Sequence, residues 1–191
     1  MRSVMRKVVA VGLLLTVAGT AVEAQTVETY ETVPACNNVR PNMGVFAGIN
    51  YMSQWTCYNF AQPPFNPASG IARLYAVSGR ANASSGSFQF LAPQQFQGAW
   101  FAGSSTVQLN LSYLGNSVWS SSSLVTTGTP TFLASGYAGA VDQVDVVGSG
   151  VSWVMDDVTY DTVVPEPASV VLLGAGLLAV TALARRRRRA A

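Results

Sequence analysis

The sequence predicts an all-β body, an antiparallel two-layer β-sandwich of the jelly-roll kind, flanked by an N-terminal signal peptide and a C-terminal transmembrane helix. Short runs of alternating apolar and polar residues recur in the middle of the chain, separated by Gly, Pro and Ser-Gly turns. No long stretch there repeats apolar residues at the helical period. Only ten of the 140 residues from 25 to 164 are charged, which is poor for a helical bundle.

Eight short strands are expected, and several have one polar face, which favours a sandwich; a barrel is the alternative. The clearest strand alternates Val107, Leu109 and Leu111 with polar residues. Trp119 and Trp153, each inside a strand, are expected to supply much of the core. The expected strands span residues 70–77, 87–91, 99–101, 106–114, 117–125, 131–133, 141–147 and 151–160.

The first 24 residues have the three parts of a secretory signal peptide. Arg2, Arg6 and Lys7 form a positive start, and residues 8–22 form an apolar run. Val22-Glu23-Ala24 then places small residues at the −3 and −1 positions of a cleavage site. We expect cleavage before Gln25 and export of the body; a retained N-terminal anchor is the alternative.

The last 27 residues, 165–191, combine a rigid motif, an apolar run and a basic end. Two prolines hold Glu166 in an extended segment that an enzyme can read. As a helix, residues 168–184 would extend roughly 25 Å, enough to cross a thin bilayer. The basic tail, residues 185–191, would resist translocation and stay in the cytoplasm. The motif is Pro165, Glu166 and Pro167, and the basic cluster is Arg185, Arg186, Arg187, Arg188 and Arg189.

This ending resembles the PEP-CTERM sorting signal of exopolysaccharide-producing Gram-negative bacteria. The resemblance implies recognition by an exosortase, a membrane transpeptidase-like cysteine enzyme that would cut near residues 165–167. The precursor would be anchored in the inner membrane and the product would reach the envelope, surface or extracellular space. An ordinary single-pass anchor that is never processed is the alternative.

Most of the basic charge lies in these two terminal segments. Residues 25–164 hold three arginines and seven carboxylates, a net charge of −4, although the whole chain is +2. A nucleic-acid role needs a basic surface to neutralise phosphates, so the sequence argues against one.

The body also resembles jelly-roll domains found upstream of this signal, similar in architecture to galactose-binding-like modules. The resemblance covers residues 96–160 and is carried by residues 96–102, 135–137, 141–144 and 153–160. It indicates the fold more strongly than it indicates a ligand.

Cys36 and Cys57 are the only cysteines, and export would place both in an oxidising compartment. A disulfide between them is therefore expected, worth roughly 3 kcal/mol by restricting the unfolded chain. The chain has no histidine, which excludes a Ser-His-Asp triad and His-ligated zinc. No motif pairs two carboxylates across a cleft, so we expect no enzymatic activity.

Asp156 and Asp157 stand side by side in an apolar strand. Because neighbouring strand residues point to opposite faces, at least one carboxylate needs a partner inside the fold. One interpretation is a Ca²⁺ site; the other is a carboxylate that accepts loop N–H bonds and pins the last strand. Asp142 and Asp145 are expected on the surface or in turns.

Two non-enzymatic functions remain open. The body is either a cell-surface or extracellular-matrix component, as in a biofilm, or a carbohydrate-binding module that retains exopolysaccharide. Sugar sites combine exposed aromatic rings with nearby amides. The aromatic candidates are Trp55, Tyr58 and Trp100, and the amides are Gln94, Gln95 and Gln97; packing in the core or a loop is the alternative for each.

Overall fold

The computed structural model describes residues 25–37, 43–163, 174, 176 and 177. The expected signal peptide (1–24), the Pro-Glu-Pro motif (165–167) and the basic tail (185–191) lie outside the described residues. So does most of the apolar run 168–184, of which only 174, 176 and 177 are described, as helical. Among the described residues, no helix has the length and hydrophobicity needed to cross a membrane.

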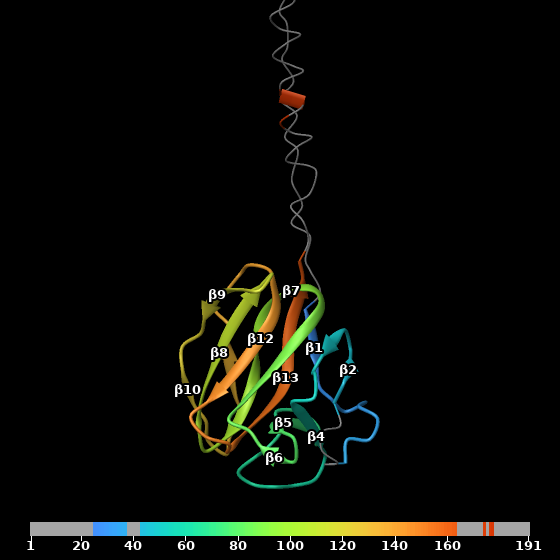
Figure 1. Cartoon of the computed structure of the whole chain (residues 1–191), viewed down its shortest axis with the longest axis vertical. Coiled ribbons are helices and arrows are strands. Elements are labelled where there is room, and N and C mark those ends of the chain that lie inside the picture. The colour runs from blue at the N-terminus through green and yellow to red at the C-terminus, as the bar shows by residue number, and fades with distance from the viewer. Residues whose placement is uncertain (1–24, 38–42, 164–173, 175, 178–191) are drawn as a thin grey trace, which may run out of the picture.

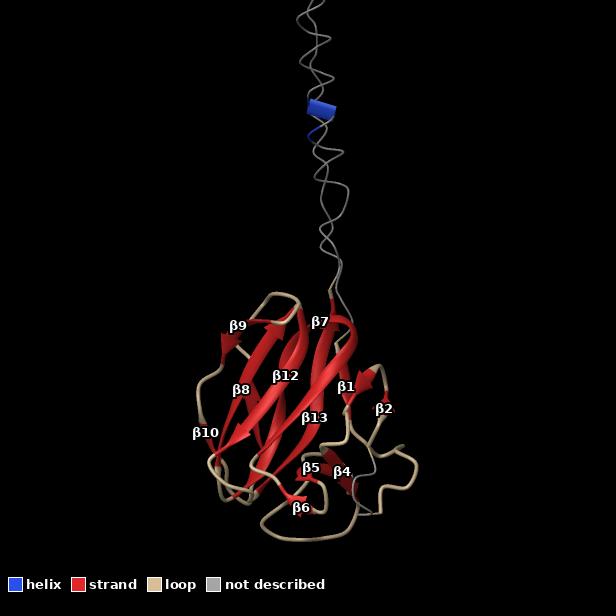
Figure 2. Ribbon diagram, viewed as in Figure 1, coloured by secondary structure: helices blue, strands red, loops and turns tan. Residues whose placement is uncertain are grey.

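The described body consists of strands joined by loops (Figures 1 and 2). Its first layer has β12 beside β7 on one side and β8 on the other, with β9 and β10 along the far edge of β8. The short β3 pairs with β7 and with β2. The bounds are β2 Val45–Phe46, β3 Ile49–Asn50, β7 Ser85–Gly103, β8 Thr106–Tyr113, β9 Asn116–Ser120, β10 Leu124–Val125 and β12 Val141–Gly148.

The second layer is built around β13, which pairs with β7, β5 and β1. β11 lies on the other side of β7, while β4 and β6 pair with β5. All of the pairings in both layers are antiparallel. The bounds are β1 Thr26–Glu28, β4 Trp55–Tyr58, β5 Arg73–Ser78, β6 Ala81–Asn82, β11 Thr131–Ala134 and β13 Trp153–Thr162.

The 19-residue β7 connects the two layers. Its first half pairs with β12 and β3, and its second half pairs with β13 and β11. The expected strands 87–91 and 99–101 are therefore parts of one strand. Residues 91–93 of this strand are exposed, and Pro93 lies where the register with β12 shifts. Proline is tolerated there because a bulge leaves ladder positions unpaired. The path of strands ends at β10 and β4, so the sheet is open and the barrel alternative is wrong.

The main core fills the space between the layers. Val107, Leu109 and Leu111 of β8 face it, as their alternation predicts, and all three are 0% exposed. Trp153 is buried as expected, with its ring 5.8 Å from that of Trp55. Such edge-to-face packing of large rings contributes about 0.5–1.5 kcal/mol beyond the area buried.

Trp119 was expected in the core, and this prediction is wrong: its side chain is 45% exposed. The expected strand 117–125 is split into β9 and β10, and Trp119 lies on the edge strand β9 opposite Leu111. Its indole N–H donates to the carbonyl of Ser135 at 2.8 Å, and its ring stacks on Tyr137. Trp119 therefore packs against the segment that follows β11 instead of entering the core.

The second layer is buried on both faces. On β13, Val154 alternates with the core residues Trp153 and Met155 and packs in a separate cluster with Tyr58 and Tyr75. Residues 59–72, the covering loop, join β4 to β5, and Phe65 of this loop packs against the cluster. The expected strand at 70–77 starts later, at Arg73, because residues 70–72 belong to this loop.

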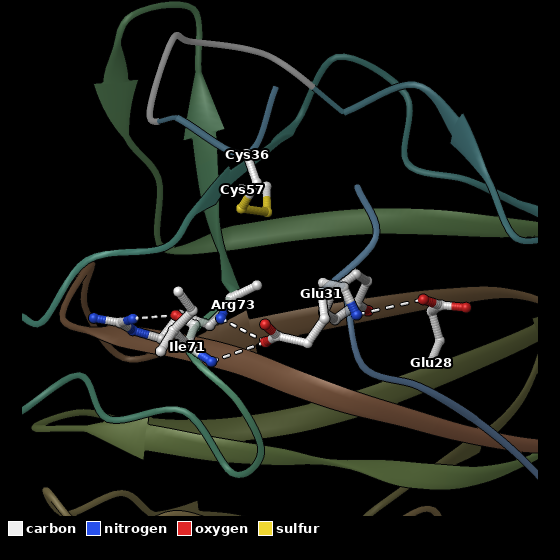
Figure 3. The surroundings of a disulfide bond; sticks show 8 residues. Glu28, Glu31, Cys36, Cys57, Ile71 and Arg73 are labelled. Atoms are coloured by element: carbon white, nitrogen blue, oxygen red, sulfur yellow. Dashed lines mark hydrogen bonds between the residues drawn. A yellow bond between two sulfur atoms is a disulfide. The ribbon is translucent and has the colours of Figure 1, made fainter. Parts of the chain in front are cut away.

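Cys36 and Cys57 form the expected disulfide, with Cα atoms 4.8 Å apart (Figure 3). Both cysteines are buried against the main core. The bond fastens the irregular chain before β2 to β4 of the second layer.

Candidate functional site

A half-open groove lies on the outer face of the second layer, between the sheet and the covering loop; we call it the aromatic groove. Tyr58 and Tyr75 come from paired strands, and their ring centroids are 5.2 Å apart. Phe60 is 46% exposed, with its ring centroid 5.1 Å from that of Tyr58. The groove has a cavity volume of about 100 Å³ and is lined by Tyr58, Phe60, Gln62, Phe65, Tyr75, Asn82, Val151, Trp153 and Val154.

A buried cation, Arg73, supports one wall of the groove. Its guanidinium donates to the carbonyl of Phe60 at 2.7 Å and to that of Ile71 at 2.8 Å, near the two ends of the covering loop. The guanidinium carbon lies 4.1 Å from the centre of the Tyr58 ring. Burial raises the pKa of Tyr58 to about 12, although Arg73 acts against the rise. Tyr58 is therefore an uncharged phenol at physiological pH.

The two adjacent carboxylates hold the middle of the covering loop. Asp156 accepts hydrogen bonds from the backbone N–H groups of Ala68 (2.8 Å) and Ser69 (3.1 Å), and Asp157 accepts one from the Ser69 hydroxyl (2.7 Å). Both reach the same loop because Asp157 has φ of +46° and the register of β13 shifts after Asp156. This bulge cancels the expected strict alternation.

A third carboxylate fastens the end of the loop that leads into β5. Glu31 accepts from the N–H groups of Ile71 (2.9 Å) and Ala72 (2.7 Å), as Figure 3 shows. Gly70 has φ of +47°, and any Cβ there would lie 2.3 Å from the Glu31 carboxyl group. Glycine is favoured at this position because a larger residue would be strained at this φ and would displace the Glu31 carboxyl group.

Asp156 is 2% exposed, and burial raises its pKa to about 7. The hydrogen bonds that it accepts oppose this rise, while the nearby Asp157 adds to it. Both Asp156 oxygens accept hydrogen bonds, since the second takes the N–H of Asp157 at 2.8 Å. In the described part of the chain, no three Asp, Glu, His or Cys side chains are placed to hold a metal ion. The geometry fits the loop-pinning interpretation of this pair.

The structure does not gather the three aromatic sugar-site candidates in one place. Trp55 is 0% exposed and donates to the carbonyl of Ser87 at 2.8 Å, so its assignment as a sugar platform is corrected to a core role. Tyr58 lines the aromatic groove. Trp100 is partly exposed beside Phe132 and lies opposite Asp156.

The glutamines expected near a sugar lie away from the groove. Gln97 donates to Asp161 at 2.7 Å, and the side-chain oxygen of Gln94 is buried without a partner. Asp142 and Asp145 are partly exposed, as expected; Asp142 accepts from the Leu114 N–H in the turn after β8.

Sequence reasoning missed most of the groove. Phe60 and Phe65 lie in a loop with no periodic pattern, and Asn82 lies in a strand of only two residues. The available signal was the density of aromatic residues between 55 and 65, in a segment with few strand features.

The PEP-CTERM protein-sorting motif family matches residues 163–189. The chain therefore carries the signal of exported proteins that an exosortase sorts. No curated protein sequence matches the chain.

Two similar solved structures are carbohydrate-binding modules. A mutant module of family 29 is 11% identical, with a TM-score of 0.44, covering 73% of this chain and 92% of its own. TmCBM61, solved with β-1,4-galactotriose, is 21% identical, with a TM-score of 0.33, covering 61% of this chain and 89% of its own. Neither likeness is strong enough to transfer a ligand or a site to this protein.

Proposed function

We propose that this chain is a non-enzymatic exported protein that an exosortase releases from the inner membrane to the cell surface or extracellular matrix of an exopolysaccharide-producing Gram-negative bacterium. The observation that carries the proposal is the sorting motif at residues 163–189. A β body with a disulfide fits an oxidising, extracytoplasmic destination. Residues 1–24 would serve as the signal peptide and residues 168–184 as the transient membrane anchor.

The non-enzymatic part of the proposal rests on side-chain chemistry. The sequence has no histidine, and the residues lining the aromatic groove include no carboxylate. General acid–base chemistry would therefore lack its usual groups there.

The test is to express the chain in a host with and without its exosortase and to map the mature C-terminus by mass spectrometry. We expect a cut near Pro165 that depends on the enzyme, and Glu166→Ala should accumulate as membrane-bound precursor. Asp145→Ala, which changes a surface carboxylate of the body, is the matched control. The same C-terminus in cells without an exosortase would refute the proposal.

Carbohydrate binding is the second proposed function, and the aromatic groove is the observation that favours it. Tyrosine and phenylalanine rings beside two side-chain amides match the way that proteins contact sugars. Trp100 is proposed as a second contact. It lies on the same face of β7 as Ala102, and Ala102 packs with Tyr58 and Tyr75 on the outer face of the second layer.

Retention of the purified chain on immobilised exopolysaccharide tests this second function. We expect retention to weaken in Trp100→Ala, with the exposed Leu91→Ala as control. A chain that elutes with the void volume from every polysaccharide would rule the function out.

A further inference from the structure

The aromatic groove has the chemistry of a site for one uncharged sugar ring. We propose that it binds a neutral hexopyranose at a chain end or side branch of the exopolysaccharide and discriminates against uronic acids. The inference rests on the second function proposed above, to which it adds the class of sugar and its location.

The size of the groove sets the extent of the ligand. Its volume of about 100 Å³ is well below the roughly 300–1,000 Å³ of sites that enclose a drug-sized ligand. A single ring, partly open to solvent, fits this space better than a long chain. Phe60 offers an exposed apolar ring at the rim for the apolar face of the sugar.

The lining is polar without charge. The exposed Gln62 and Asn82 bring amides that both donate and accept, as sugar hydroxyls require, while the buried Tyr58 and Tyr75 form the floor with their uncharged rings. Residues of this kind can satisfy hydroxyl groups at any physiological pH. A carboxylate placed among them would be desolvated without a counter-ion.

The nearby cations do not change this conclusion. Arg73 keeps its positive charge, but its side chain is 1% exposed and both terminal nitrogens donate to backbone carbonyls, so it cannot form an ion pair with a ligand in the groove. Arg80 lies between β5 and β6 and is not among the groove residues. The body as a whole, residues 25–164, has a net charge of −4, which further disfavours acidic sugars.

The groove is also held open before any ligand arrives. Arg73 fixes the backbone at Phe60, and Asp156 fixes it at Ala68 and Ser69. The side-chain amide of Asn66 bonds to the carbonyl of Gly128, which ties the loop to a neighbouring loop. A wall anchored at several points loses little conformational entropy on binding, which favours affinity for a small ligand.

The experiment uses the full chain in a zwitterionic detergent without a sugar head group. Methyl glycosides of glucose, galactose and mannose are titrated against those of glucuronic and galacturonic acid, and binding is followed by NMR or calorimetry. We expect binding of at least one neutral glycoside, weaker or no binding of the matched uronate, and about tenfold lower affinity in Phe60→Ala.

Gln62→Ala gives a second readout if Phe60→Ala proves unstable, and Leu91→Ala is the exposed apolar control remote from the groove. If uronates bind as tightly as neutral sugars, or if neither groove variant changes the affinity, this inference is overturned while carbohydrate binding stands. If no glycoside and no polysaccharide binds, both are overturned.

Discussion

Replacing Asp156 by asparagine should remove a pH dependence of stability that the buried carboxyl group creates. Burial raises the pKa of Asp156 from an ordinary value of 3.8 to about 7 in the folded protein. Between these values the folded state keeps a proton that the unfolded chain has released. The free energy of unfolding therefore falls as pH rises from about 4 to about 7, and it is lowest above pH 7.

The size of the effect follows from the same two values. A rise from 3.8 to about 7 corresponds to at most about 4 kcal/mol of stability lost across the window. In Asp156→Asn the change of the free energy of unfolding with pH should shrink to the contribution of other groups. One of these is Glu28, since burial also raises the pKa of its carboxyl group.

Urea unfolding at pH 4.5, 6 and 8, followed by the fluorescence of the buried tryptophans, measures this slope. Asp145→Asn, a change to a partly exposed carboxylate on β12, should leave the slope unchanged. The reasoning is refuted if Asp156→Asn keeps the full slope, or if the wild type gains stability as pH rises through this range.

Three further results are expected. Cys36→Ser with Cys57→Ser should lower the free energy of unfolding by about 3 kcal/mol, because the disulfide no longer restricts the unfolded chain; chemical denaturation measures it, and an unchanged midpoint contradicts it. Arg73→Met should destabilise the fold by about 3 kcal/mol, since the part-buried carbonyls of Phe60 and Ile71 lose charged donors; thermal unfolding checks this, and a stability equal to wild type argues against a role of Arg73 in fixing the covering loop. Treatment with EDTA should not move the melting temperature, because hydrogen bonds already engage Asp156 and Asp157; a fall that calcium reverses would restore the Ca²⁺ interpretation.

The long strands of the body could be predicted from sequence because their alternation records burial directly. Val107, Leu109 and Leu111 mark β8 without any tertiary information. The continuity of β7 could not be predicted, because Pro93 normally ends a strand and only the shifted register with β12 accommodates it. Trp119 was misassigned because periodicity gives the face of a strand but does not say whether the strand lies at an edge.

The groove was harder to predict for a different reason. Tyr58 could be selected as an aromatic candidate, but its neighbours come from β4, β5, β6, β13 and a loop that are separated in sequence. The roles of Arg73 and Glu31 depend on hydrogen bonds to backbone groups of the covering loop. Such bonds cannot be predicted from residue types, because every residue has a backbone. Asp156 and Asp157 were correctly singled out because two carboxylates in an apolar strand need partners.

The antiparallel pairing of β1 with β13 decides where the two ends of the described body lie. Thr26 lies beside Tyr160, so both junctions with the terminal segments leave from one pole. Val154, at the groove, and Thr162 are eight residues apart on β13, or roughly 26 Å. Figure 1 shows β5 and β6 at the pole opposite the end of β13. The aromatic groove therefore lies toward the pole opposite the one at which β13 ends, and most of the length of β13 separates the two.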